Sequence, residues 1–175
     1  AEEQLRQARK NYEADPKNVA RAWQLGKAYF FAGEFATDQA ARARLAEQGI
    51  AVCHRALAAK PDSAETGYYH ALNQGQLART KLFGALSLVR HIEGGLRKAA
   101  RSKPKLDFAG PDRCLGLLYR DAPGWPISVG SHKKAKSHLL KTIALVPEYP
   151  ENILVLLETW IKWKDYRQLK ADLPA

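Results

Sequence analysis

Apolar residues recur every three or four positions along most of this chain, which is the spacing of one face of an α-helix. One such face comprises Ala22, Leu25, Tyr29 and Ala32, and another comprises Ala64, Tyr68, Ala71, Gly75 and Ala78. A glycine on an apolar helix face predicts the close approach of a neighbouring helix, and we expect this at Gly75. Because strand-like alternation of apolar and polar residues is absent, the sequence predicts an all-α protein.

Four prolines in similar contexts divide the helical pattern. They lie in the stretches ADPKN, AKPDS, SKPKL and LVPEY, and successive prolines are 43 to 45 residues apart. Proline cannot continue a helix, so each interval is expected to hold two helices. The predicted repeat units are 16–60, 61–103, 104–146 and a partial unit 147–175, all within a single helical-repeat domain over residues 1–175.

The residue pattern inside the repeats resembles tetratricopeptide helices. The stretch AWQLGKAYFFAGEF, residues 22–35, resembles the first helix of such a unit, and RALAAKP, residues 55–61, resembles the end of its second helix. The period alone favours HEAT or armadillo repeats, which have about 40 to 47 residues against about 34 in a tetratricopeptide unit. The aromatic and glycine pattern with the closing proline nevertheless favours tetratricopeptide-like helices that have been lengthened. We therefore expect a tetratricopeptide-like right-handed superhelix of antiparallel helix pairs, with extended repeats of about 44 residues.

The stretch APGWPISVGS, residues 122–131, interrupts the helical pattern. Pro123 is expected to end one helix, Pro126 to keep Trp125 extended, and Gly130 with Ser131 to turn the chain into the next helix, with Ser131 as its N-cap. Trp125 then has two interpretations. It folds back to plug the helix array, which is the commoner arrangement, or it lines a pocket or partner surface as an exposed anchor.

The net charge of +10 is concentrated in two stretches with few acidic residues. Between Glu65 and Asp107 the single acidic residue is Glu93, and no acidic residue lies between Asp121 and Glu148. A solvated helix face accounts for such charge, and an acidic protein, an anionic ligand or an anionic membrane surface is the functional alternative. Nucleic-acid binding is not expected, because no reading module accompanies the basic residues.

The sequence contains no recognisable catalytic, metal or cofactor motif. Its five histidines form no HExxH pattern, and Cys53 and Cys114 read as small buried hydrophobic residues. We therefore expect a non-enzymatic protein without metal or cofactor. No apolar run approaches the roughly 20 residues that cross a bilayer. Because the chain has no methionine, its natural start is expected upstream.

A longer pattern resembles the bacterial TRAP-transporter T-component family. It is carried by AWQLGKAYFFAGE, by GIAVCHRALAAKPDSAETGYYHALNQGQLAR and, most strongly, by residues 110–152, which include the PGWPISVGS loop. This resemblance implies a bacterial periplasmic protein, lipid-anchored through a missing N-terminal segment or secreted, that binds the solute-binding protein of a TRAP transporter. It also implies a lumen for a small ligand and an oligomeric assembly. Eukaryotic regulator-of-microtubule-dynamics proteins look similar but more distant, without this loop.

Two functional hypotheses follow. A protein-interaction adaptor or generic tetratricopeptide scaffold would bind its partner through concave helix faces and the basic residues Arg97, Lys98 and Arg101. A carrier of a small, partly apolar or anionic ligand would instead have a continuous cavity. The residues expected to line that cavity are Tyr29, Tyr68, Tyr69, Asn73 and Trp125. A homo-oligomer is a further expectation, because the segment Ile153–Trp163 is apolar on two faces.

Overall fold

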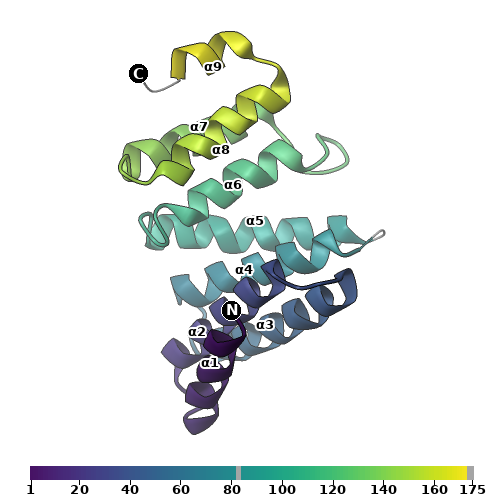
Figure 1. Ribbon diagram of the computed structural model, residues 1–175, viewed down its shortest axis with the longest axis vertical. Coiled ribbons are helices and arrows are strands. Elements are labelled where there is room, and N and C mark those ends of the chain that lie inside the picture. Colours follow the sequence, from purple (N-terminus) through teal and green to yellow (C-terminus); the bar gives the residue numbers. More distant parts are fainter. Residues whose placement is uncertain (82–83, 173–175) are drawn as a thin grey trace. The chain divides into compact units, whose positions relative to one another are not determined.

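The computed structural model describes residues 1–81 and 84–172, and the regular elements in these ranges are all α-helices. Figure 1 shows them as successive coils joined by turns and loops. The helices are α1 (Glu2–Ala14), α2 (Val19–Glu34), α3 (Gln39–Ala59), α4 (Ala64–Arg79), α5 (Ala85–Ser102), α6 (Gly110–Asp121), α7 (His132–Leu145), α8 (Pro150–Trp163) and α9 (Tyr166–Asp172). The all-α prediction is confirmed.

The chain divides into two compact units. The first ends at Ser102 and contains α1–α5, and the second begins at Lys103 and contains α6–α9. This division falls beside Pro104, at the expected limit between the second and third repeat units. The single-domain organisation and the four repeat units stay predictions.

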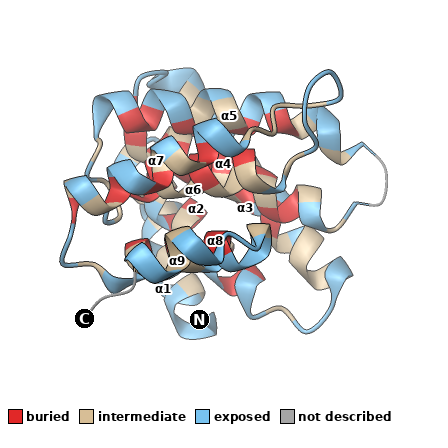
Figure 2. Ribbon diagram, turned by 90° about the horizontal axis from the view of Figure 1, so that it is seen from above, coloured by how far each residue is buried: buried red, intermediate tan, exposed pale blue. Residues whose placement is uncertain are grey.

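The first unit is built from helices that pack in sequence order. Each of α1–α4 packs against the next helix, and α2 also packs against α4. A helix that contacts both its own partner and the first helix of the following pair is typical of stacked helix-pair repeats. One core cluster consists of Ala22, Leu25, Tyr29, Val52 and Ala56. Figure 2 shows such buried positions on the inward sides of the helices. The predicted helix-pair packing is confirmed.

Side-chain caps explain where several helices begin. The side chain of Asn18 accepts hydrogen bonds from the backbone N–H groups of Ala20 and Arg21 at the start of α2. Ser131 accepts one from Lys134 at 3.3 Å, so the N-cap predicted for α7 is confirmed. Such a cap satisfies a backbone donor that has no partner inside the helix, and contributes about 1 kcal/mol.

A close approach of helices occurs at Gly26 and not at Gly75. A Cβ built on Gly26 of α2 would lie 2.3 Å from the Sγ of Cys53 in α3, whereas one built on Gly75 meets nothing within 4 Å. The expectation for Gly75 is therefore wrong. Its apolar neighbours along α4 indicated a packed face, but the space beside this position is open.

The second unit repeats the same packing scheme. Each of α6–α8 packs against the next helix, and α6 also contacts α8. Leu139, Val155, Leu156 and Trp160 form its core cluster. Pro150 is the first residue of α8, where its missing N–H costs no helical hydrogen bond. A short helix, α9, follows α8, and the Trp160 indole donates to Asp172 at 2.8 Å.

One of the two apolar faces predicted for the segment Ile153–Trp163 is largely buried. Leu156 and Trp160 belong to the core, whereas Leu154 and Ile161 on the other face are about half exposed. An apolar face in solvent is a candidate for contact with a second chain, and the oligomer stays a prediction.

Candidate functional site

The exposed side of α5 carries a cationic stripe, which we define as Arg90, Arg97 and Arg101. These residues are spaced by seven and four positions, so they share one helix face, and all three are exposed. The opposite face is buried through Val89, Ile92, Leu96, Ala99 and Ala100. The Glu93 carboxylate lies 3.6 Å from the Arg97 guanidinium and offsets part of its charge. The stripe as a whole keeps a positive field toward solvent.

Lys98 differs from the other two basic residues that the sequence singled out. Its Nζ donates a 2.5 Å hydrogen bond to the backbone carbonyl of Pro61, in the turn before α4. Lys98 is exposed, yet it also fastens α5 to that turn. Arg97 and Arg101 are therefore the residues of the predicted set whose side chains extend the stripe.

Three of the predicted cavity residues lie inside the helix packing of the first unit. Tyr68, Tyr69 and Asn73 are each at most 2% exposed. The Asn73 amide donates to the backbone carbonyls of Gly26 at 2.9 Å and Tyr69 at 2.7 Å, which ties α4 to α2. A ligand would touch these side chains only after the helices had moved apart. Their positions give them a structural role, and ligand binding by them stays a prediction.

Tyr29 lies closer to the surface than those three residues. Its hydroxyl accepts a hydrogen bond from Arg9 Nε at 3.1 Å, and the same guanidinium lies 5.2 Å from the centre of its ring. Tyr29 lines a surface depression together with residues of α1 and α3, which include Tyr12 and Val52. Tyr29 therefore joins α1 to the repeat helices.

Trp125 is exposed on the loop between α6 and α7, with 89% of its surface open to solvent. The interpretation that it folds back into the helices is therefore wrong. The side chain lies in the second unit, whereas Tyr29, Tyr68, Tyr69 and Asn73 lie in the first. The Trp125–Pro126 peptide bond is cis. Of the residues predicted from the sequence, Trp125 is the one whose apolar surface is most available to a partner.

A fully buried carboxylate in the second unit was not among the predicted residues. Asp112 of α6 accepts a hydrogen bond from His138 at 2.7 Å and lies 2.9 Å from the Lys141 ammonium, and both partners belong to α7. Burial opposes the charge on this carboxylate, but the hydrogen bonds from His138 and Lys141 hold its pKa below its ordinary value. The His138 ring also stacks on Tyr119. The group joins α6 to α7.

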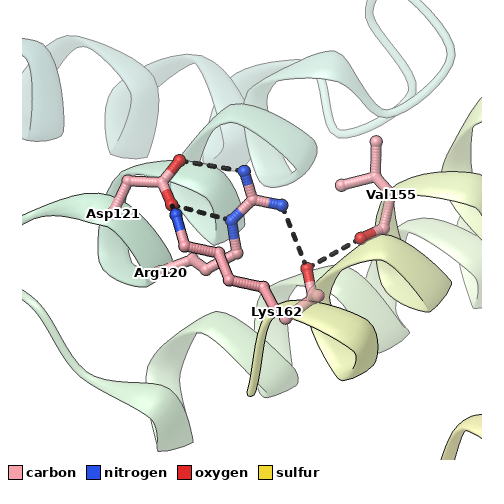
Figure 3. Close-up of polar contacts among 5 residues, drawn as sticks. Arg120, Asp121, Val155 and Lys162 are labelled. Carbon is pink, nitrogen blue, oxygen red and sulfur yellow. Dashed lines mark hydrogen bonds and ion pairs between the residues drawn. The ribbon is translucent and has the colours of Figure 1, made fainter. Parts of the chain in front are cut away.

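A second polar cluster joins α6 to α8 (Figure 3). The Arg120 guanidinium makes two hydrogen bonds of 2.9 Å with Asp121, and the Lys162 ammonium lies 2.6 Å from the same carboxylate. Arg120 also donates to Thr159 at 3.3 Å. Burial raises the pKa of Asp121, but its hydrogen bonds to Arg120 and Lys162 outweigh this effect and lower it. The sequence carries no local pattern for this pairing, because Asp121 and Lys162 are 41 residues apart.

Histidines of the first unit lie near one another without forming a metal centre. The rings of His54 and His70 are 6.3 Å apart. Burial, followed by the charges of His54 and His91, lowers the pKa of His70. Within residues 1–81 and 84–172, no group of three or more histidine, cysteine or acidic side chains could hold a metal ion. No helix in these ranges has both the length and the apolarity to cross a membrane.

The comparison with protein families matches residues 1–104 to the family described as regulator of microtubule dynamics protein 1-3. This segment covers more than half of the 175 residues and nearly coincides with the first unit, α1–α5. A comparison with curated proteins found no match.

The family match corrects the assignment to the TRAP-transporter T-component family, which is wrong. The expected bacterial origin, periplasmic location and solute-binding-protein partner rested on that resemblance and fall with it. Its strongest part, residues 110–152, lies outside the matched segment. The leucine, glycine and tyrosine spacing within residues 22–35 reflects helix packing, as Gly26 against Cys53 illustrates, and packing constraints are common to many helical-repeat families. On the match over residues 1–104, the chain belongs to the regulator of microtubule dynamics protein 1-3 family.

Proposed function

We propose that this chain is a non-catalytic interaction protein whose first unit binds an acidic protein surface through the cationic stripe of α5. The observation that carries this proposal is the exposure of Arg90, Arg97 and Arg101 along one face of a helix whose other face is buried. Clustered like charges create a field that steers an oppositely charged partner and aligns it on binding.

The stripe has properties suited to a protein partner. Guanidinium groups donate several hydrogen bonds in a fixed fork, which matches carboxylate side chains, and arginine is enriched in protein interfaces. The helix beneath is anchored by five buried apolar residues, so the arginines start from a fixed backbone. Less conformational entropy is then lost on association.

The absence of catalysis is part of the proposal. Helix packing accounts for the shifted pKa values of four described groups: Asp112 and Asp121 through ion pairs, Cys53 and His70 through burial. Structural ion pairs shift pKa values as active sites do. None of the four is paired with a nucleophile that could start a reaction.

The microtubule is the first partner to test, because the family is described as regulating microtubule dynamics. The experiment is co-sedimentation of the full chain with polymerised microtubules over a range of microtubule concentrations. We expect binding, and a loss of affinity of about tenfold or more when Arg90, Arg97 and Arg101 are each replaced by Glu.

A control variant carries the same change in net charge at another place. Lys10, Lys17 and Arg44 are exposed cationic residues of the first unit that lie outside α5, and their replacement by Glu also lowers the charge by about six. We expect this variant to bind nearly as the unmodified chain does. Equal losses in the two variants would show that only net charge matters, and no sedimentation at all would exclude the microtubule as the partner.

A further inference from the structure

The loop between α6 and α7 ends in an apolar tip, which we define as Trp125, Pro126 and Ile127. Trp125 is 89% exposed and Ile127 is 68% exposed. Large apolar side chains that remain this exposed give up the free energy that burial would supply. Two such side chains on either side of a proline form a contiguous exposed apolar tip, and contiguous exposed apolar surface marks interaction sites.

The loop is held in shape by its own backbone. The N–H of Gly130 donates to the carbonyl of Pro123 at 2.9 Å, and the N–H of Ile127 donates to that of Gly124 at 3.0 Å. A Cβ on Gly130 would lie 2.1 Å from the carbonyl oxygen of Ala122, so this close crossing requires glycine. The tip is thus presented on a stiff base, and little loop entropy would be lost when it meets a partner.

Positive charge surrounds the base of this loop. Lys133 and Lys134 are exposed in the first turn of α7, and the Lys134 ammonium lies 5.1 Å from the ring centre of Tyr119. The carboxylate that precedes the loop, Asp121, is paired with both Arg120 and Lys162. Its negative charge is therefore compensated, and the field near the tip is cationic.

We propose that this loop docks the second unit on the surface of an anionic lipid bilayer. Trp125 and Ile127 enter the boundary between headgroups and acyl chains, where indole rings are enriched in membrane proteins. Lys133 and Lys134 face the anionic headgroups, and each contributes roughly fivefold in affinity at low salt. The apolar and the electrostatic contributions reinforce each other, as in other peripheral membrane anchors.

The shape of the tip favours a bilayer over a protein groove. A tryptophan that anchors a protein interface is normally surrounded by flat contact area that excludes water. Here the apolar surface of the loop ends at the tip itself, because the preceding Gly124 is exposed and has no side chain and the following Ser128 is polar. A bilayer needs no matching groove, because its headgroups rearrange around the inserted side chains.

This inference is independent of the proposed function, since the loop lies outside the segment matched to the family and outside α5. The experiment is flotation of the full chain with vesicles of phosphatidylcholine alone and with vesicles of equal parts phosphatidylcholine and phosphatidylserine. We expect binding to the mixed vesicles and much weaker binding to phosphatidylcholine alone. Binding should fall roughly tenfold in Trp125→Ala, and also in Lys133→Glu with Lys134→Glu.

The matched control is Phe35→Ala, which removes an aromatic side chain that is 76% exposed at the end of α2. This variant should bind vesicles as the unmodified chain does. Thermal unfolding of Trp125→Ala should also be unchanged, because the side chain is almost entirely in solvent.

A second readout uses vesicles that contain brominated phosphatidylcholine, which quenches tryptophan fluorescence on contact. The unmodified chain should be quenched, and the quenched fraction should disappear in Trp125→Ala. The proposal is overturned if the full chain does not bind the mixed vesicles, or if Trp125→Ala and Phe35→Ala bind them equally. Trp125→Ala should co-sediment with microtubules as the unmodified chain does. A failure of the bilayer proposal is therefore distinguishable from a failure of the microtubule proposal.

Discussion

Gly26 and Cys53 occupy one tight contact between α2 and α3. The thiol is fully buried, and burial raises the pKa of Cys53 to about 12. Because an added Cβ at Gly26 would lie 2.3 Å from the Sγ, either the Cys53 side chain or one of the two helices must shift. We expect Gly26→Ala to lower the free energy of unfolding by about 1–3 kcal/mol, measured by urea denaturation.

Gly75→Ala is the control, and its expected effect on the free energy of unfolding has the opposite sign. It lies within α4 with nothing near its missing Cβ, so it should stabilise the chain by up to about 1 kcal/mol. Adding Cys53→Ala to Gly26→Ala should recover part of the loss, since the atom that clashes is removed. A neutral Gly26→Ala variant would contradict the tight contact.

The reactivity of the two cysteines is a further test at this scale. Neither cysteine is in a disulfide; Cys53 is buried, and Cys114 is partly accessible. A buried thiol with a pKa of about 12 carries almost no thiolate at pH 8. Iodoacetamide should therefore leave Cys53 unmodified in the folded protein while Cys114 reacts, as read by mass spectrometry. Modification of Cys53 before unfolding would contradict its burial.

Single residues show where sequence patterns suffice and where they do not. The buried Cys53 followed from its place on an apolar helix face. The backbone conformation of Asp107, Phe108 and Ala109 could not be predicted from the sequence, because all three have positive φ although none is glycine. Arg113, five and six residues further along the chain, donates hydrogen bonds to the carbonyls of Phe108 and Asp107, and the residue pattern does not show which carbonyls an arginine will reach.

At the scale of elements, the Asp112 network holds α6 against α7. Burial raises the pKa of this carboxylate, but the hydrogen bonds from His138 and Lys141 lower it further than burial raises it. A carboxylate with a lowered pKa in the folded state adds stability above its ordinary value of 3.8, and that stability is lost as the pH falls through the folded-state pKa. Asp112→Asn should therefore cost about 3 kcal/mol at pH 7.

The difference between the unmodified chain and Asp112→Asn should shrink as the pH falls from 3.8 through the lower folded-state pKa, because the carboxyl becomes protonated first in the unfolded state and then in the native state. Denaturant unfolding at a series of pH values measures this. Asp62→Asn is the control at an exposed carboxylate, and it should change stability by less than about 0.5 kcal/mol at every pH. A difference that is independent of pH would contradict the ion pair.

Helix limits could be predicted from local chemistry, whereas contacts between helices could not. Ser131 precedes α7 as the predicted N-cap, and Pro150 is the first residue of α8, a position that favours proline. The sequence left the exposure of Trp125 as the less common of two interpretations, because an apolar side chain folds back only where the helices leave a space for it. The pairing of Asp112 with residues of α7 likewise depends on how two helices pack.

At the scale of the whole molecule, net charge is the property from which we predict partner binding. A net charge of +10 and an arginine stripe predict that partner binding depends on salt, since a screening length of about 10 Å at 0.1 M salt shortens further as salt is added. The affinity for microtubules should fall at least about tenfold between 0.05 and 0.3 M salt. The variant with Arg90, Arg97 and Arg101 replaced by Glu should lose less affinity over the same range of salt, because less of its binding is electrostatic. An affinity that is independent of salt would contradict an electrostatic contact.

Fold class could be predicted from the sequence at this scale, whereas of the two families with a similar pattern the sequence analysis ranked the wrong one first. Helix-pair periodicity and the prolines sufficed for an all-α repeat protein. The same periodicity is compatible with several repeat families, because it follows from how helices pack. The basic residues Arg97 and Arg101 could be found from charge alone, yet their arrangement with Arg90 on one exposed face depends on which side of α5 is buried.

The central claim is that the stripe on α5 is the contact surface, and arginine-specific labelling with phenylglyoxal tests it most directly. The full chain is labelled with and without microtubules, and each arginine is quantified by mass spectrometry. The account predicts that microtubules protect Arg90, Arg97 and Arg101, while exposed Arg44 in α3 labels equally in both samples. Unchanged labelling of the stripe, or protection of Arg44 instead, would contradict it.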